Sequence, residues 1–126
     1  MKTLALKAFA RWAAKHGISS ETLLEVARRP AYLGSAVTLG QQLWKVRIAK
    51  GNRGKSAGYR TILLHVLGDR IIFLYGFEKN ESPNVSASQL ADLKAVGRVY
   101  AELPRDLLEL LISNRELIDL ENPDHE

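Results

Sequence analysis

The 126-residue sequence predicts one α+β domain, with an N-terminal helical hairpin and C-terminal helices packed on an antiparallel sheet. Apolar residues recur at helical spacing near both ends of the chain, whereas the middle alternates apolar and polar residues as strands do. The composition, 46% hydrophobic and 25% charged, is that of an ordinary globular protein, and no internal repeat is visible. We therefore expect a single domain over residues 1–126, with a short acidic tail at about 114–126.

The hairpin is expected to begin with a helix over about residues 7–16, followed by Gly17 as a natural C-terminal cap. Ser19 or Ser20 can cap a second helix, which Arg28, Arg29 and Pro30 end. Phe9 and Trp12 lie on the apolar stripe of the first helix and are expected in the core.

The central strands follow residues 31–42, which are small, polar and interrupted by glycine and therefore predict a connecting loop. In 43–49, Trp44, Val46 and Ile48 alternate with Lys45 and Arg47, so one face is apolar and the other cationic. Segments 59–67 and 71–77 are rich in β-branched and aromatic residues, and Gly68 and Asp69 predict a tight two-residue turn between them.

Two more helices are expected in the last third of the chain. Ser86 and Gln89 form a capping box ahead of a helix whose apolar stripe includes Leu90, Leu93, Gly97 and Tyr100. Pro104, at its favoured first position, begins a shorter helix that ends near Ser113.

The charge distribution predicts a polyanionic partner. Residues 1–77 carry 13 Lys and Arg against 3 Asp and Glu, whereas residues 78–126 carry 5 against 11. The chain has no cysteine, which excludes thiolate catalysis and a cysteine zinc site and is compatible with the cytoplasm. Charges interrupt the N-terminal apolar residues and no apolar run is long enough for a bilayer, so we expect a soluble cytoplasmic protein.

The strongest functional signal is a run of six cations without an acid between residues 45 and 60. They are Lys45, Arg47, Lys50, Arg53, Lys55 and Arg60. The Gly-Lys-Ser at 54–56 lacks the glycine spacing of a phosphate-binding loop, and the three histidines are too scattered for a metal motif. We expect neither a metal nor another cofactor. His65 shares strand parity with Thr61 and not with Arg60, so it should point away from the cations.

Three motifs in this order resemble the RelE/HigB toxins of bacterial toxin–antitoxin pairs. They are Lys45-Val46-Arg47-Ile48, Gly58-Tyr59-Arg60 and Tyr75-Gly76-Phe77-Glu78-Lys79-Asn80-Glu81, and the likeness extends from Phe9 to about Leu120. Most similar is a branch with a lengthened, glycine- and lysine-rich loop before Gly-Tyr-Arg. The resemblance implies an endoribonuclease that cuts mRNA on the ribosome and is silenced by a cognate antitoxin with a DNA-binding domain. It implies no membrane partner and no small-molecule cofactor.

The resemblance also assigns roles to residues. Lys45 and Arg47 match the cations of the first site strand, Arg60 the phosphate-gripping arginine, and Lys79 the lysine after the third strand. We expect these four to be catalytic, with Arg60 exposed. The expected RNA-binding residues are Lys50, Arg53, Lys55, Tyr59 and Asn80.

The sequence departs from several relatives where proton transfer is concerned. Asn80 and Ser86 stand where those relatives have an arginine and a tyrosine, which leaves the acid–base group open, with Tyr59 and Tyr75 as alternatives. Two other functions share these features. A non-catalytic protein could bind RNA or the ribosome through the same cations, and a ParE-like topoisomerase inhibitor would have the same fold.

Overall fold

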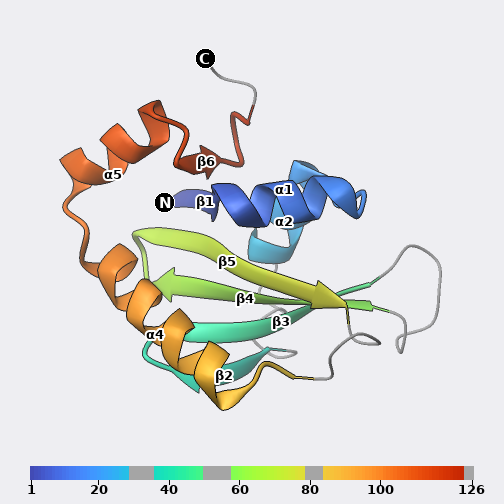
Figure 1. Ribbon diagram of the computed structural model, residues 1–126. Coiled ribbons are helices and arrows are strands. Elements are labelled where there is room, and N and C mark those ends of the chain that lie inside the picture. Colours follow the sequence, from blue (N-terminus) through green and yellow to red (C-terminus); the bar gives the residue numbers. More distant parts are fainter. Residues whose placement is uncertain (29–35, 50–57, 79–83, 124–126) are drawn as a thin grey trace.

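The computed structural model describes residues 1–28, 36–49, 58–78 and 84–123. Its elements are β1 (Lys2–Leu6), α1 (Lys7–Lys15), α2 (Ser20–Arg28), β2 (Val37–Gly40), β3 (Leu43–Ala49), β4 (Gly58–Val66), β5 (Arg70–Glu78), α4 (Ala87–Glu102), α5 (Arg105–Ser113) and β6 (Leu117–Asp119). The strands form one sheet in the order β2-β3-β4-β5-β1-β6, and helices lie on both of its faces (Figure 1).

The chain begins with a strand, so the expected N-terminal helical hairpin is not confirmed as the start of the fold. Helices α1 and α2 form close to their predicted ranges, but β1 precedes them and runs parallel to β5. The sheet is therefore mixed and not purely antiparallel. Leu4 and Ala5 are both fully buried although they face opposite sides. A strand covered on both faces lacks the alternation that marks a half-exposed one, which explains why the sequence pattern does not predict β1.

Two edge strands lie where a loop and a tail were expected. Strand β2 is largely exposed, and a two-residue turn at Gln41 and Gln42 joins it to β3. Both glutamines have positive φ, 53° and 68°, in a turn that usually contains Asn or Gly, so the sequence held no hairpin signal. Strand β6 has three residues, of which Leu117 is fully buried, and it pairs with β1.

The predicted starts of α2 and α4 are confirmed, and that of α5 is shifted by one residue. Gly17 has φ 70° after α1, and Ser19, not Ser20, caps α2 by accepting a hydrogen bond from the Thr22 amide at 3.1 Å. The capping box of Ser86 and Gln89 is present at the start of α4. Pro104 is the N-cap of α5 and not its first helical residue.

The hairpin of β4 and β5 contains an irregularity that matters for the site. Its turn has three residues, 67–69, where two were expected, because Val66 pairs with Arg70. Further along, Leu63 pairs with Phe73 but Ile62 pairs with Tyr75. Leu74 is thus an extra residue on β5, a β-bulge, and beyond it the strand presents the opposite alternation of side chains.

Two hydrophobic cores lie on the two faces of the sheet. One joins α1 and α2 to the sheet through Phe9, Leu23 and Phe73, among others, and the second joins α4 and α5 through Leu43, Leu74 and Leu108, among others. Gly97 allows α4 to lie close to the sheet, since a Cβ there would be 3.0 Å from Leu43 Cδ2. None of the helices in the described ranges is long and apolar enough to cross a membrane.

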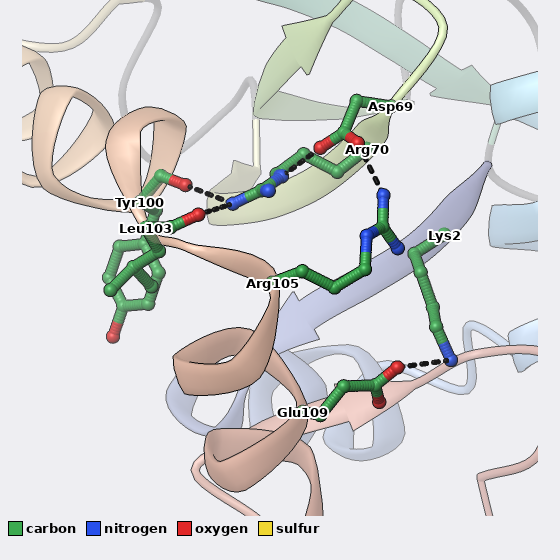
Figure 2. Close-up of polar contacts among 7 residues, drawn as sticks. All are labelled: Lys2, Asp69, Arg70, Tyr100, Leu103, Arg105 and Glu109. Atoms are coloured by element: carbon green, nitrogen blue, oxygen red, sulfur yellow. Dashed lines mark hydrogen bonds and ion pairs between the residues drawn. The ribbon is translucent and has the colours of Figure 1, made fainter.

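A charged cluster holds the end of α4 against the sheet (Figure 2). The buried side chain of Arg70 donates from Nη1 to the carbonyl oxygens of Tyr100 and Leu103, at 3.1 and 2.9 Å, and from Nε to Asp69. Asp69 also accepts a hydrogen bond from Arg105. The hydrogen bond from Arg70 is the main reason that the pKa of Asp69 lies below its usual value. The orientation of α4 across the sheet therefore depends on Arg70.

Candidate functional site

The candidate site is a cationic and aromatic surface on the α4 face of β3, β4 and β5. Two rows of paired residues run across these strands: Lys45, Ile62 and Tyr75 form the first, and Arg47, Arg60 and Phe77 form the second. Residues paired in register point to the same face of a sheet. Three of the four predicted catalytic residues, Lys45, Arg47 and Arg60, are therefore brought together. We call the two rows the cationic face.

Arg60 is buried, contrary to the expectation that it is exposed. Only 8% of its surface is accessible to solvent. It lies on a central strand between Arg47 and Phe77, and its guanidinium bends back over Gly58. A Cβ on Gly58 would lie 3.5 Å from Arg60 Nη1 and 2.9 Å from the carbonyl oxygen of Ile48. The glycine of Gly-Tyr-Arg is thus required by the close approach of the Ile48 carbonyl oxygen, and the Arg60 guanidinium lies in contact distance beside it.

The environment of Arg60 is unfavourable for a cation that has no ligand. Its Nη1 is buried and makes no hydrogen bond within the parts of the chain that the structure describes. Burial lowers the pKa of Arg60, and the neighbouring charge of Arg47 lowers it further. Arginine stays protonated despite such shifts, so both charges persist. A bound anion would give Nη1 a partner and offset the repulsion, because charge-assisted hydrogen bonds are among the strongest in proteins.

The N-terminal end of α4 reaches the first row. Lys45, half-buried on β3, donates a hydrogen bond from Nζ to Asn84 Oδ1 at 2.9 Å. Gln89, in the first turn of α4, donates from Nε2 to the Tyr75 hydroxyl at 3.5 Å. The sequence predicted Gln89 as a capping residue and nothing more, and Asn84 carried no signal at all.

The bulge at Leu74 brings Tyr75 to the cationic face. Tyr75 lies beside Phe77, with ring centroids 6.0 Å apart, and both share the face of their partners Ile62 and Arg60. Gly76 faces the other way, where a Cβ would lie 2.3 Å from the Trp12 ring. Without the bulge, Tyr75 would continue the alternation of Ile71 and Phe73 and lie in the core under α1.

Tyr59 and His65 lie on the opposite face, toward α1. Tyr59 is 6% exposed, packs edge-on against Trp12 at 5.5 Å and donates a hydrogen bond to the carbonyl oxygen of His16 at 3.5 Å. The structure therefore does not bring Tyr59 to the expected RNA-binding surface. His65 pairs with Ile71 of the α1-side core, which confirms its predicted direction, and burial lowers its pKa.

The remaining predicted site residues lie outside the described ranges. They are Lys79 among the catalytic residues and Lys50, Arg53, Lys55 and Asn80 among the RNA-binding ones. Within those ranges, no group of three or more His, Cys, Asp or Glu side chains is arranged to hold a metal ion.

Comparison with known families identifies one match over almost the entire chain. Residues 1–120 match the family described as the RelE toxin of the RelE/RelB toxin–antitoxin system. A search of curated proteins found no match.

Proposed function

This chain belongs to the RelE family of toxins from toxin–antitoxin systems, and on that basis we propose that it is an endoribonuclease that cuts mRNA on the ribosome. It would act in the cytoplasm without a metal or organic cofactor and be neutralised by a cognate antitoxin. The proposed reaction is attack of a ribose 2′-hydroxyl on the adjacent phosphorus. Such a reaction needs stabilisation of extra charge on the phosphate and protonation of the leaving oxygen.

The observation that supports this proposal most is the state of Arg60. A buried guanidinium with an unused donor and a second arginine beside it suits a phosphate group that gains charge during the reaction. Arginine is favoured for phosphate because its planar fork can donate two parallel hydrogen bonds. Few purely structural roles would retain a buried arginine without a partner, because it destabilises the folded protein.

The other cations have graded roles in the proposal. Arg47 is exposed beside Arg60 and would contact the scissile phosphate or the next one, and Lys45 would stabilise charge on the attacking oxygen. Lys79 keeps the catalytic role that the resemblance assigns to it. Lys50, Arg53, Lys55 and Asn80 would bind the RNA backbone, which adds affinity and salt dependence.

The antitoxin is proposed to act by covering the cationic face. Acidic side chains or an added helix would meet Lys45, Arg47 and Arg60 and remove them from RNA. Opposite charge across such an interface also speeds association. A toxin–antitoxin complex in which these three residues stayed open to solvent would instead indicate that the antitoxin blocks entry to the ribosome.

The test is Arg60→Met, assayed by single-turnover cleavage of mRNA on programmed ribosomes and by urea unfolding. We expect cleavage to fall about 10²- to 10³-fold, as when a donor to a developing oxyanion is removed. Because the change removes an unpaired buried charge and keeps most of the volume, the free energy of unfolding should stay equal or rise. Loss of activity without loss of stability is the signature of a residue retained for catalysis.

The control is His65→Gln on the opposite face, which should fold and cleave like the unmodified protein. Full activity of Arg60→Met would show that the cationic face is not the site of cleavage. If the unmodified protein binds ribosomes but leaves mRNA intact, it is a binding protein and not a nuclease. Growth arrest with intact mRNA and altered DNA supercoiling would favour topoisomerase inhibition.

A further inference from the structure

We infer that Tyr75 protonates the leaving 5′-oxygen, an inference that rests on the proposed RNA cleavage. In that step the 2′-oxygen forms a bond to phosphorus, and the bond from phosphorus to the 5′-oxygen breaks with its electron pair on that oxygen. The hydroxyl proton of Tyr75 passes to the 5′-oxygen, and the 2′-hydroxyl proton passes to hydroxide from solvent. The phenolate then regains a proton from water, which returns hydroxide, and the products are a 2′,3′-cyclic phosphate and a 5′-hydroxyl.

The choice of Tyr75 follows from the side chains that the described part of the cationic face presents. Arg47 and Arg60 hold their protons too tightly to serve as acids near neutral pH. Of the two other titratable groups, Lys45 donates one of its three ammonium hydrogens to Asn84 Oδ1 at 2.9 Å and lies on the side where the proposed function places the attacking oxygen. The oxygen of Tyr75 instead accepts a hydrogen bond, from Gln89 Nε2 at 3.5 Å. That bond leaves the hydroxyl proton of Tyr75 available for an acceptor such as the leaving oxygen.

The register of the sheet places Tyr75 on one side of the phosphate position and Lys45 on the other. Both belong to the row centred on Ile62, with β4 between them, so their backbones are about 10 Å apart, two strand spacings. Arg60 lies two residues along β4, diagonal to both and within reach of long side chains. In phosphoryl transfer the attacking and leaving oxygens are roughly in line through phosphorus. A phosphate held by Arg60 can thus have its 2′-oxygen near Lys45 and its 5′-oxygen near Tyr75.

The support for the Tyr75 hydroxyl comes from the first turn of α4. Gln89 Oε1 accepts a hydrogen bond from the backbone amide of Ser86 at 2.9 Å, which fixes the orientation of the amide group whose Nε2 donates to Tyr75. The N-terminal end of a helix carries partial positive charge, which stabilises a phenolate formed beside it. The half of the capping box in which Gln89 accepts from the Ser86 backbone amide therefore also positions the proposed acid.

The experiment compares Tyr75→Phe with the unmodified protein on two mRNAs in programmed ribosomes. One mRNA has the natural oxygen at the cleaved bond, and the other has a bridging 5′-sulfur there. Sulfur leaves as a thiolate without protonation, so a missing acid should not slow that reaction. We expect Tyr75→Phe to cleave the oxygen mRNA about 10²- to 10⁴-fold more slowly, the usual contribution of an acid–base group, and the sulfur mRNA at the unmodified rate.

Two further variants test the support from α4. Gln89→Met removes the donor to Tyr75 and should slow cleavage of the oxygen mRNA by a smaller factor than Tyr75→Phe does. Cleavage of the sulfur mRNA by Gln89→Met should again proceed at the unmodified rate. Ser86→Ala, which removes the other half of the capping box, controls for weaker capping and should not alter the ratio of the two rates. Phenylalanine keeps the ring contact with Phe77, so unfolding of Tyr75→Phe in urea should match the unmodified protein.

The outcomes separate this inference from the proposed function. Equal loss on both mRNAs would show that Tyr75 stacks on or positions the RNA and does not donate a proton. An undiminished rate on the oxygen mRNA would exclude any role in the reaction. Either result overturns the inference about Tyr75, while cleavage of mRNA by the unmodified protein would still support the proposed nuclease function. Absence of cleavage by the unmodified protein would overturn both.

Discussion

At the scale of single residues, the Tyr75-Gly76-Phe77 segment divides its side chains between two faces. Tyr75 and Phe77 join the cationic face, and the absence of a side chain on Gly76 lets the Trp12 ring lie directly on β5. Trp12 in turn contacts Phe9 and Tyr59, with ring centroids 5.5 Å away in each case. A substitution at Gly76 would therefore disturb the aromatic packing under α1.

We expect Gly76→Ala to lower the free energy of unfolding by about 2 to 3 kcal/mol, near the upper end for overpacking, because its Cβ would overlap the Trp12 ring. Gly97→Ala is the matched control. Its tightest Cβ contact would be with the movable end of Leu43 at 3.0 Å, and alanine is favoured over glycine inside a helix by about 1 kcal/mol. Urea unfolding measures both variants. Equal stability of the two would mean that Trp12 can move aside without cost.

At the scale of secondary-structure elements, α4 connects the structural cluster to the site. Its last turn is held by Arg70, which donates to the carbonyl oxygens of Tyr100 and Leu103. Its first turn supplies Gln89 to Tyr75, and Asn84 just before it contacts Lys45. Figure 1 shows the helix running across the sheet between these two ends. Contacts at one end of α4 thus help to set the position of the other.

We expect Arg70→Met to reduce the free energy of unfolding by about 2 to 3 kcal/mol at pH 7, because two carbonyl oxygens and Asp69 lose a charged donor. The effect should depend on pH. The pKa of Asp69 is lower in the folded protein, so its contribution is complete above the ordinary carboxyl value near 3.9 and is lost as pH falls below it. The penalty should therefore shrink between pH 5 and about pH 2 in urea titrations. Arg98→Met, at an exposed arginine of α4, should cost little at any pH. A penalty that did not change with pH would show that Asp69 is not coupled to Arg70.

At the scale of the whole molecule, opposite charges are concentrated in different regions. The cationic face lies on β3, β4 and β5, with its cations on β3 and β4. Many of the acids lie instead on α5, β6 and the residues that follow, and some of these acids pair with Lys2 and Arg28. The paired acids contribute to holding the C-terminal elements against the N-terminal ones. Among the described residues, Lys45, Arg47 and Arg60 form no ion pair with an acid. Their positive charge is therefore available to attract a polyanion.

We expect affinity for programmed ribosomes to fall steeply with salt, because cations that contact phosphates release condensed counterions. The double variant Arg53→Gln and Lys55→Gln should reduce the slope of log affinity against log salt by about 1 to 2, the value for two lost phosphate contacts. Lys7→Gln with Arg11→Gln is the control, since these exposed cations lie on α1, across the sheet from the site. Filter binding over a salt series gives both slopes. An unchanged slope for the first pair would mean that those two cations do not contact RNA.

The sequence by itself determined the faces of the central strands, the caps of two helices and the family of this protein. Alternation in 43–49 correctly placed Lys45 and Arg47 on the face opposite Val46 and Ile48, and capping signals located α2 and α4. These features depend on neighbours within a few residues, which is why the sequence alone reveals them. The run of cations and the three motifs likewise indicated the toxin family that the family comparison shows.

Tertiary structure alone decided the remainder, because it depends on contacts between distant residues. Leu4 and Ala5 form a strand only because β5 and β6 flank them and cores cover both of their sides. The bulge at Leu74 exists only in the pairing of β4 with β5, yet it decides which tyrosine reaches the cationic face. The burial of Arg60 likewise depends on strands that meet in the folded sheet. Residue types therefore indicated the chemistry, and non-local pairing selected which of those residues meet.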